Sequence, residues 1–160
     1  MKMQSMFAAV LLVSALLTSC ESSEDDTNTS ANQVNTTELR STAQAGQWQI
    51  TYFFDTDSDE TADFAGYVFT FASDGTVIAE KDGTQLPGSW SVTDDSDDLT
   101  DDSPDDDSDD VDFNLSFVSP ASFAELTDDW DILEYSDTRI KLIDVSGGNG
   151  GTDYLTFEKI

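Results

Sequence analysis

Hydrophobic and polar residues alternate with a period of two over most of the chain after residue 46. The clearest run covers residues 111–117, where Val, Phe, Leu and Phe are separated by Asp, Asn and Ser. A period of two places successive side chains on opposite faces of a strand. Segments with this pattern are 48–54, 67–71, 76–81, 89–93, 111–117, 130–135, 138–145 and 152–159. The pattern predicts an all-β, antiparallel domain of about eight strands, with one buried face and one wet face.

The connections between these segments carry turn signals. Asp-Gly pairs at 74–75 and 82–83 predict tight hairpins, because both residue types tolerate positive φ. The glycine-rich run 147–151 predicts a flexible turn before the last strand. Short strands joined by such turns are typical of barrels and sandwiches. We expect a small antiparallel β-barrel over residues 46–160.

One short helix is predicted, over residues 120–127. Ser119 is a suitable capping residue, and Pro120 suits the first turn of a helix. Phe123 and Leu126 are three residues apart, so they face the sheet together. We expect this helix to cover one end of the barrel.

The N-terminal segment has the features of a secretory signal. Lys2 precedes an apolar stretch at 6–17, about 18 Å long as a helix at ~1.5 Å per residue. A membrane span needs roughly 20 such residues, so the stretch is too short to be one. Residues 17–20, Leu-Thr-Ser-Cys, resemble the lipobox of bacterial lipoproteins. The resemblance implies removal of residues 1–19, diacylglycerol and N-acyl chains on Cys20, and anchoring in the outer membrane; the alternative is a plain cleaved signal and a free thiol.

Residues 20–45 are rich in Glu, Asp, Thr, Asn and Ser. Such a segment buries too little apolar surface to offset its ordering entropy, so we expect a disordered tether behind the acylated N-terminus. Its acidic residues directly after Cys20 resemble the export signal of some surface lipoproteins. The cell envelope is therefore the expected location, with outward display and a periplasm-facing position as the two alternatives.

Three short motifs resemble those of lipocalin-like domains. They are Gly-Gln-Trp at 46–48, Phe-Ala-Ser-Asp-Gly-Thr at 71–76 and Gly-Ser-Trp at 88–90. Behind a lipobox, this combination is similar to the small lipocalin-like lipoproteins of bacterial envelopes. The resemblance implies a compact β-barrel with a ligand cavity, without defining one ligand.

Aromatic residues on the predicted strands are the candidates for a binding site. A barrel of about eight strands holds one small apolar ligand if its interior is open. The candidate lining residues are Trp48, Tyr52, Phe69, Phe71, Trp90 and Phe113. The alternative is that these rings fill the interior, which favours a surface interaction or display module without a small-molecule ligand.

The net charge and the lack of certain residue types argue against several classes of function. The chain has 34 Asp and Glu against 6 Lys and Arg, a net charge of −28, which argues against nucleic-acid binding. It has one Cys and no His, which excludes an internal disulfide, a Cys/His zinc site and imidazole catalysis. No carboxylate pair stands out by spacing, so we expect a non-enzymatic protein. Among the few basic residues, we expect Arg139 to pair with a carboxylate on the outer face, with ligand anchoring as the alternative.

Two acidic segments are candidates for Ca²⁺, which takes six to eight oxygen ligands. The first is the connection 94–110, whose alternative interpretation is a solvated loop. The second begins like a calcium loop, but it has Glu60 where an EF-hand needs Gly and Gly66 where it needs Glu. A non-standard site there would use Asp55, Asp57, Asp59 and Asp63. The corresponding alternative function is an acidic, Ca²⁺-binding display protein with a filled barrel.

Overall fold

The computed structural model of the chain describes residues 34–94, 111–145 and 151–160. Contacts divide the chain into two units, 1–30 and 31–160, and all described residues belong to the second. The predicted signal, Cys20 and most of the acidic connection lie outside the described residues. Within the described part, no helix is long and apolar enough to cross a bilayer.

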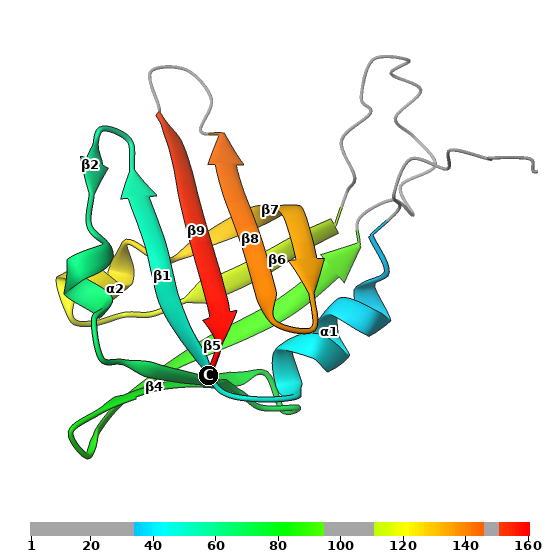
Figure 1. The fold of residues 1–160 in the computed structure, drawn as a ribbon, viewed down its shortest axis with the longest axis horizontal. Coiled ribbons are helices and arrows are strands. Elements are labelled where there is room, and N and C mark those ends of the chain that lie inside the picture. The colour runs from blue at the N-terminus through cyan, green and yellow to red at the C-terminus, as the bar shows by residue number, and fades with distance from the viewer. Residues whose placement is uncertain (1–33, 95–110, 146–150) are drawn as a thin grey trace, which may run out of the picture. The chain divides into compact units, whose positions relative to one another are not determined.

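The described residues form an antiparallel β-barrel (Figure 1). Each strand pairs with the next along the sheet, and β1 also pairs with β9, which closes the sheet on itself. Eight strands form the barrel, and the short β2 extends β1 at its edge. The strands are β1 Trp48–Asp55, β2 Ser58–Asp59, β3 Val68–Phe71, β4 Thr76–Lys81, β5 Thr84–Asp94, β6 Val111–Ser116, β7 Asp128–Ser136, β8 Arg139–Val145 and β9 Thr152–Lys159. The predicted fold class is confirmed.

The hairpin between β4 and β5 follows the predicted turn chemistry. Asp82 and Gly83 both have positive φ, at 52° and 76°, as a tight two-residue turn requires. β5 begins at Thr84, earlier than the expected 89, because the hairpin pairs continuously from Lys81↔Thr84 onward. Gly88 is required within that extension, since a Cβ there would lie 2.7 Å from the Phe117 ring.

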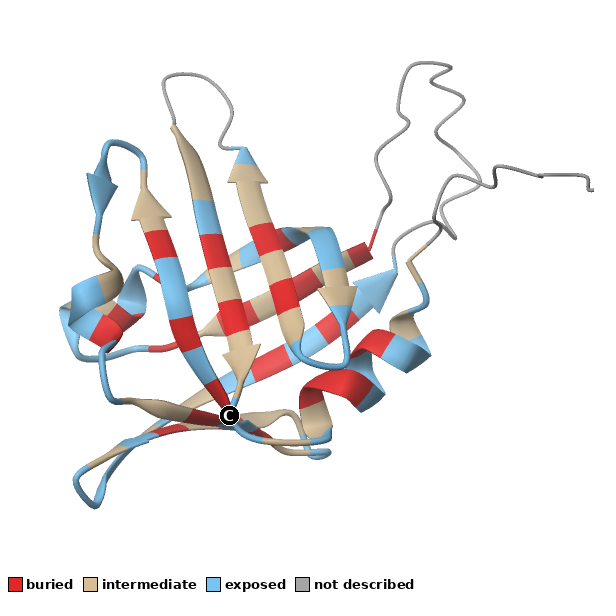
Figure 2. Cartoon of the chain, in the orientation of Figure 1, coloured by how far each residue is buried: buried red, intermediate tan, exposed pale blue. Residues whose placement is uncertain are grey.

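Buried residues alternate with more exposed ones along most of the strands, most regularly in β6 and β8 (Figure 2). The interior side chains are nearly all aromatic or aliphatic. The described part holds a single cluster of buried apolar residues, to which every strand except β2 contributes.

The alternation expected in β1 is wrong beyond Ile50. A bulge lies between the pairs Ile50↔Phe157 and Tyr52↔Thr156, so the strand has one extra residue there. A bulge reverses the orientation of the side chains that follow it. Phe53 is therefore buried, whereas Tyr52 lies on the outer face and is 40% exposed.

The end of the expected tether is a helix instead. Helix α1 covers Thr36–Gln44 and packs beside β5 (Figure 1). Asn35 caps it by accepting a hydrogen bond from the Glu38 N–H at 3.1 Å. Its buried residues, Leu39, Thr42 and Ala43, share one face at helical spacing. The prediction failed because one large aliphatic and two small residues suffice to bury a helix against a preformed barrel.

The one predicted helix, expected over residues 120–127, is shorter than expected. Helix α2 covers Ala121–Ala124 and has no side-chain cap from Ser119. Beyond its end, the Thr127 hydroxyl accepts a hydrogen bond from the Phe117 N–H at 2.9 Å and donates one to the Phe117 C=O at 3.0 Å. Phe123 and Leu126 are both buried, as predicted.

Replacing Leu39 by Ala tests whether α1 belongs to the folded domain. Leu39 is fully buried, so Leu39→Ala should lower the free energy of unfolding by about 2–4 kcal/mol. Thr37→Ala, at an exposed position of the same helix, should change it by less than about 0.5 kcal/mol. Urea denaturation of the full chain measures both free energies of unfolding. An equally small effect of the two substitutions would contradict the inclusion of α1 in the folded domain and support a disordered tether.

Candidate functional site

The barrel interior contains five of the six aromatic residues predicted to line a pocket. They are Trp48, Phe69, Phe71, Trp90 and Phe113, and each is at most 6% exposed. Tyr52, the sixth, lies outside because of the β1 bulge, with its ring 6.4 Å from that of Phe54.

The interior rings contact one another. The Phe71 ring centroid lies 5.1 Å from that of Trp90 and 5.5 Å from those of Phe113 and Phe157. Edge-to-face pairs at such distances are the favoured arrangement of aromatic side chains. The Trp90 indole N–H donates to the Ala72 carbonyl at 2.9 Å, so its polar group is satisfied by the backbone. These rings therefore occupy the space that a ligand would need.

Helices cover both ends of the barrel. At one end, the Trp48 indole donates to the Ala43 carbonyl of α1 at 2.8 Å. At the other end, the 3₁₀ helix η1, Thr61–Phe64, lies near α2. Phe64 and Phe123 contact there with centroids 5.2 Å apart, and Phe64 also packs against Phe53. Sequence reasoning missed Phe53 and Phe64; the adjacent pair Phe53-Phe54 was the one signal of a broken alternation.

The predicted calcium ligands do not form one cluster with each other. In the described part of the chain, the one group of three acids with oxygens within 4.8 Å of one another is Asp55, Glu60 and Glu125. Of the four predicted ligands, this group contains Asp55 alone. Asp59 instead accepts a hydrogen bond from the Thr61 N–H at 3.1 Å, and hydrogen bonds from Thr61 lower the pKa of its carboxyl.

The three carboxyls come from three elements that meet at this end of the barrel. Asp55 is the last residue of β1, Glu60 precedes η1, and Glu125 follows α2. A hydrogen bond with Glu125 is the main cause that raises the pKa of Glu60; desolvation and the charges of Glu125, Asp55 and Asp63 add to it. These contacts favour the neutral form of the Glu60 carboxyl.

A second acidic group lies at the same barrel end, where β7 begins and β8 ends. Desolvation raises the pKa of Asp128 to about 6, and the charges of Asp144 and Asp129 add to the effect. The pKa of Asp131 is raised by burial and by the same two neighbours. This end of the barrel therefore binds protons more tightly than isolated carboxylates do.

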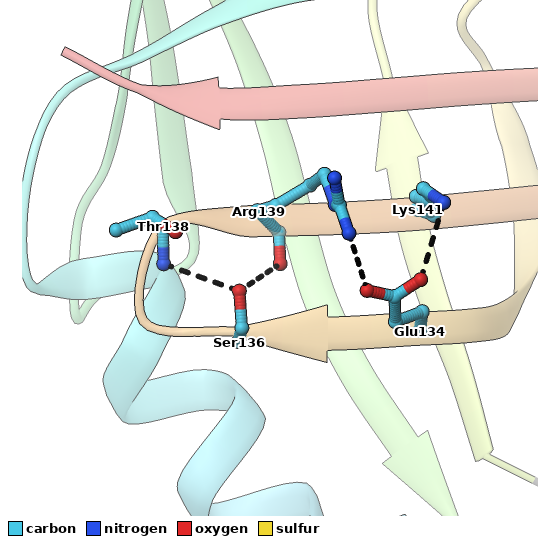
Figure 3. A network of polar contacts seen from close by, with 5 residues as sticks. All are labelled: Glu134, Ser136, Thr138, Arg139 and Lys141. Carbon is cyan, nitrogen blue, oxygen red and sulfur yellow. Dashed lines mark hydrogen bonds and ion pairs between the residues drawn. The ribbon is translucent and has the colours of Figure 1, made fainter.

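Arg139 pairs with a carboxylate on the outer face, as expected (Figure 3). Its guanidinium lies 2.6 Å from Glu134, and the Lys141 ammonium lies 3.1 Å from the other oxygen of the same carboxylate. Hydrogen bonds from Arg139 and then Lys141 lower the pKa of Glu134. The two basic residues of β8 thus hold one acid of β7.

A groove lies on the outer face of the β3–β4 hairpin. Its volume is about 440 Å³, within the range of small-molecule sites. The lining residues are Gln47, Gly66, Val68, Thr70, Ile78, Glu80, Lys81, Asp82 and Gln85. None of the predicted site residues belongs to it, because the prediction considered the side chains directed into the barrel.

Comparison with known proteins does not show a family for this chain. No protein-family model matches the sequence. No curated protein matches it significantly either. Among solved structures, the chain is similar to a DUF4847 family protein from Bacteroides vulgatus, with 16% identity and a TM-score of 0.42. The match covers 75% of this chain and 96% of that one, and at this level it carries no functional inference.

Asp128→Asn tests the electrostatics of the acidic barrel end. The folded-state pKa of about 6 exceeds the ordinary 3.8, so the stabilising effect of protonation is complete below pH 3.8 and is lost as the pH rises through 6. Asn keeps an acceptor for the Asp129 N–H but carries no charge. At pH 7.5 we expect a gain of about 1 kcal/mol, after allowing for solvent screening, or about 3–5 °C in Tm.

The gain should shrink strongly by pH 4, because the carboxyl is then protonated in the folded state and close to half protonated in the unfolded state. Asp137→Asn removes the same charge from an exposed turn and serves as the control for net charge. Thermal melts from pH 4 to 8 measure both variants, and an equal gain for the two at pH 7.5 would show that net charge alone is responsible.

Proposed function

We propose that this protein is a lipid-anchored cell-envelope lipoprotein whose filled barrel acts as an interaction module through its outer surface. The observation that carries the proposal is the packing of the barrel interior by its own rings. A ligand carrier of this architecture needs an open interior and an entrance. Here the rings contact one another, and helices cover both ends.

The anchor is supported by the sequence around Cys20. The single thiol of the chain stands at the position that the lipobox requires. One acyl chain gives marginal membrane binding and two or three give a durable anchor, so full lipidation would keep the domain on its membrane. The acidic residues after Cys20 favour outward display, where a module with an active outer surface meets its partners.

Metabolic labelling with a tagged fatty acid tests the anchor. The native chain should incorporate the label and sediment with membranes, whereas Cys20→Ala should lose both properties. Ser22→Ala, two residues beyond Cys20, serves as the matched control and should keep both. Unlabelled native protein that begins at Met1 would contradict the anchor.

A cavity-creating substitution tests whether the barrel is filled. Phe71 is 2% exposed, so Phe71→Ala should cost about 3–5 kcal/mol and leave an apolar cavity of roughly one ring. Benzene, used as an apolar probe, should bind this variant and not the native protein, which is measured as a benzene-dependent rise in Tm. Phe71→Leu gives a smaller cavity and a folded comparison if the Ala variant is too unstable, and Tyr52→Ala, on the outside, should leave probe binding unchanged. If the native protein binds the probe and Phe71→Leu binds it more weakly, the result would instead support a ligand site inside the barrel.

A further inference from the structure

We infer that the groove on the outer face of β3 and β4 binds a small organic cation with an apolar body, such as an alkylammonium. The inference rests on the proposed function, in which the protein interacts through its outer surface. It names the class of ligand that one groove on that surface binds. It depends on the geometry of the hairpin and on the charge of the protein.

The floor of the groove comes from outward-facing residues of two paired strands. Val68 lies opposite Glu80, and Thr70 lies opposite Ile78. Their neighbours Phe69 and Ala79 are buried in the barrel, so these four side chains lie on the outer face. The floor therefore combines two half-buried aliphatic side chains with a carboxylate and a hydroxyl.

The groove has walls because the sheet separates next to β3. The pairing of β3 with β1 is limited to Trp48↔Phe69, and Gln47, the residue just before β1, lines one side. On the other side, the turn after β4 and Gln85 of β5 form the rim. A flat sheet face offers no such enclosure, so the local separation of the strands creates the groove.

The basic residue of the groove is already engaged. The Lys81 ammonium donates to the Ala65 carbonyl at 2.7 Å and lies 5.2 Å from the centre of the Tyr67 ring. Glu80 accepts a hydrogen bond from the Gln85 amide at 2.7 Å, which orients its carboxylate. A carboxylate has about four acceptor positions, so Glu80 keeps the capacity to bind a ligand.

Charge selects a cation for this groove. The chain carries a net charge of −28, and such a field raises the local concentration of cations and repels anions. Glu80 and Asp82 place two acids at the groove itself. An ammonium bound to Glu80 gains a charge-assisted hydrogen bond, and its alkyl body would cover Val68 and Ile78. A metal ion or a fully polar cation would leave that aliphatic floor unused.

Three probes separate the parts of this recognition in an NMR titration of the full acylated chain in nanodiscs. Hexylammonium has charge and apolar body, methylammonium has charge alone, and hexan-1-ol has the body alone. Hexylammonium should shift the amide signals of Val68, Thr70 and Ile78 saturably, and the other two probes should do so at least about tenfold more weakly. Partition of a probe into the lipid is the same for every variant and cancels in their comparison.

Two charge variants supply the decisive contrast. Glu80→Gln should weaken hexylammonium binding by at least about fivefold. Asp57→Asn removes the same charge from an exposed position outside the groove and should change it by less than about twofold. Equal responses to hexylammonium and methylammonium, or equal losses in the two variants, would reduce the effect to general attraction by an acidic protein. An equal response to hexan-1-ol would reduce it to apolar contact alone. Each of these results would overturn the site. Either result leaves the fatty-acid labelling of Cys20 unaffected, so failure of the groove is distinguishable from failure of the anchor.

Discussion

Packing of aromatic rings inside a closed barrel is the constraint on which the rest of this structure depends. Each buried ring removes about 150–250 Å² from water, at roughly 25 cal/mol per Å². That gain must offset both the ordering of the chain and the mutual repulsion of many carboxylates. Rings such as Phe69, which contacts Phe117, Phe123 and Phe157, connect strands that are far apart in the sequence. A filled interior also moves any recognition of partners to the outside.

The acidic residues are distributed according to the same constraint. None lies in the buried core of the described residues, and those with raised pKa gather at the barrel end that η1 and α2 cover. The chain has few cations to compensate them, and the two on β8 are both engaged by Glu134. Carboxylates at this end of the barrel repel one another, but solvent screens part of their charge and so reduces the cost in stability.

The strands were predictable because period-two patterning and Asp-Gly turns are local signals, and one buried face fixes the register of a strand. Helix α1 was not predictable in this way, since its stability comes from burial of Leu39 and Ala43 against a barrel that the local sequence does not reveal. The bulge in β1 was equally hidden, and it moved Tyr52 out of the predicted site. The cluster of Asp55, Glu60 and Glu125 was not predicted for a related reason. Glu125 lies far from the other two in the sequence, and only the fold brings them together. The groove arises from a local separation of β1 and β3, which no pattern within either strand encodes.

The pairing of β1 with β9 has a consequence for how the polypeptide reaches its folded state. Trp48 lies beside Lys159, so the seam joins residues from opposite ends of the domain. Contacts of such long sequence separation are slow to form, because the intervening chain must lose its freedom first. A ribosome or translocation channel that releases the polypeptide from its N-terminal side delivers every other strand before the one that completes the seam. Until that strand pairs, the aromatic side chains have no closed interior in which to pack.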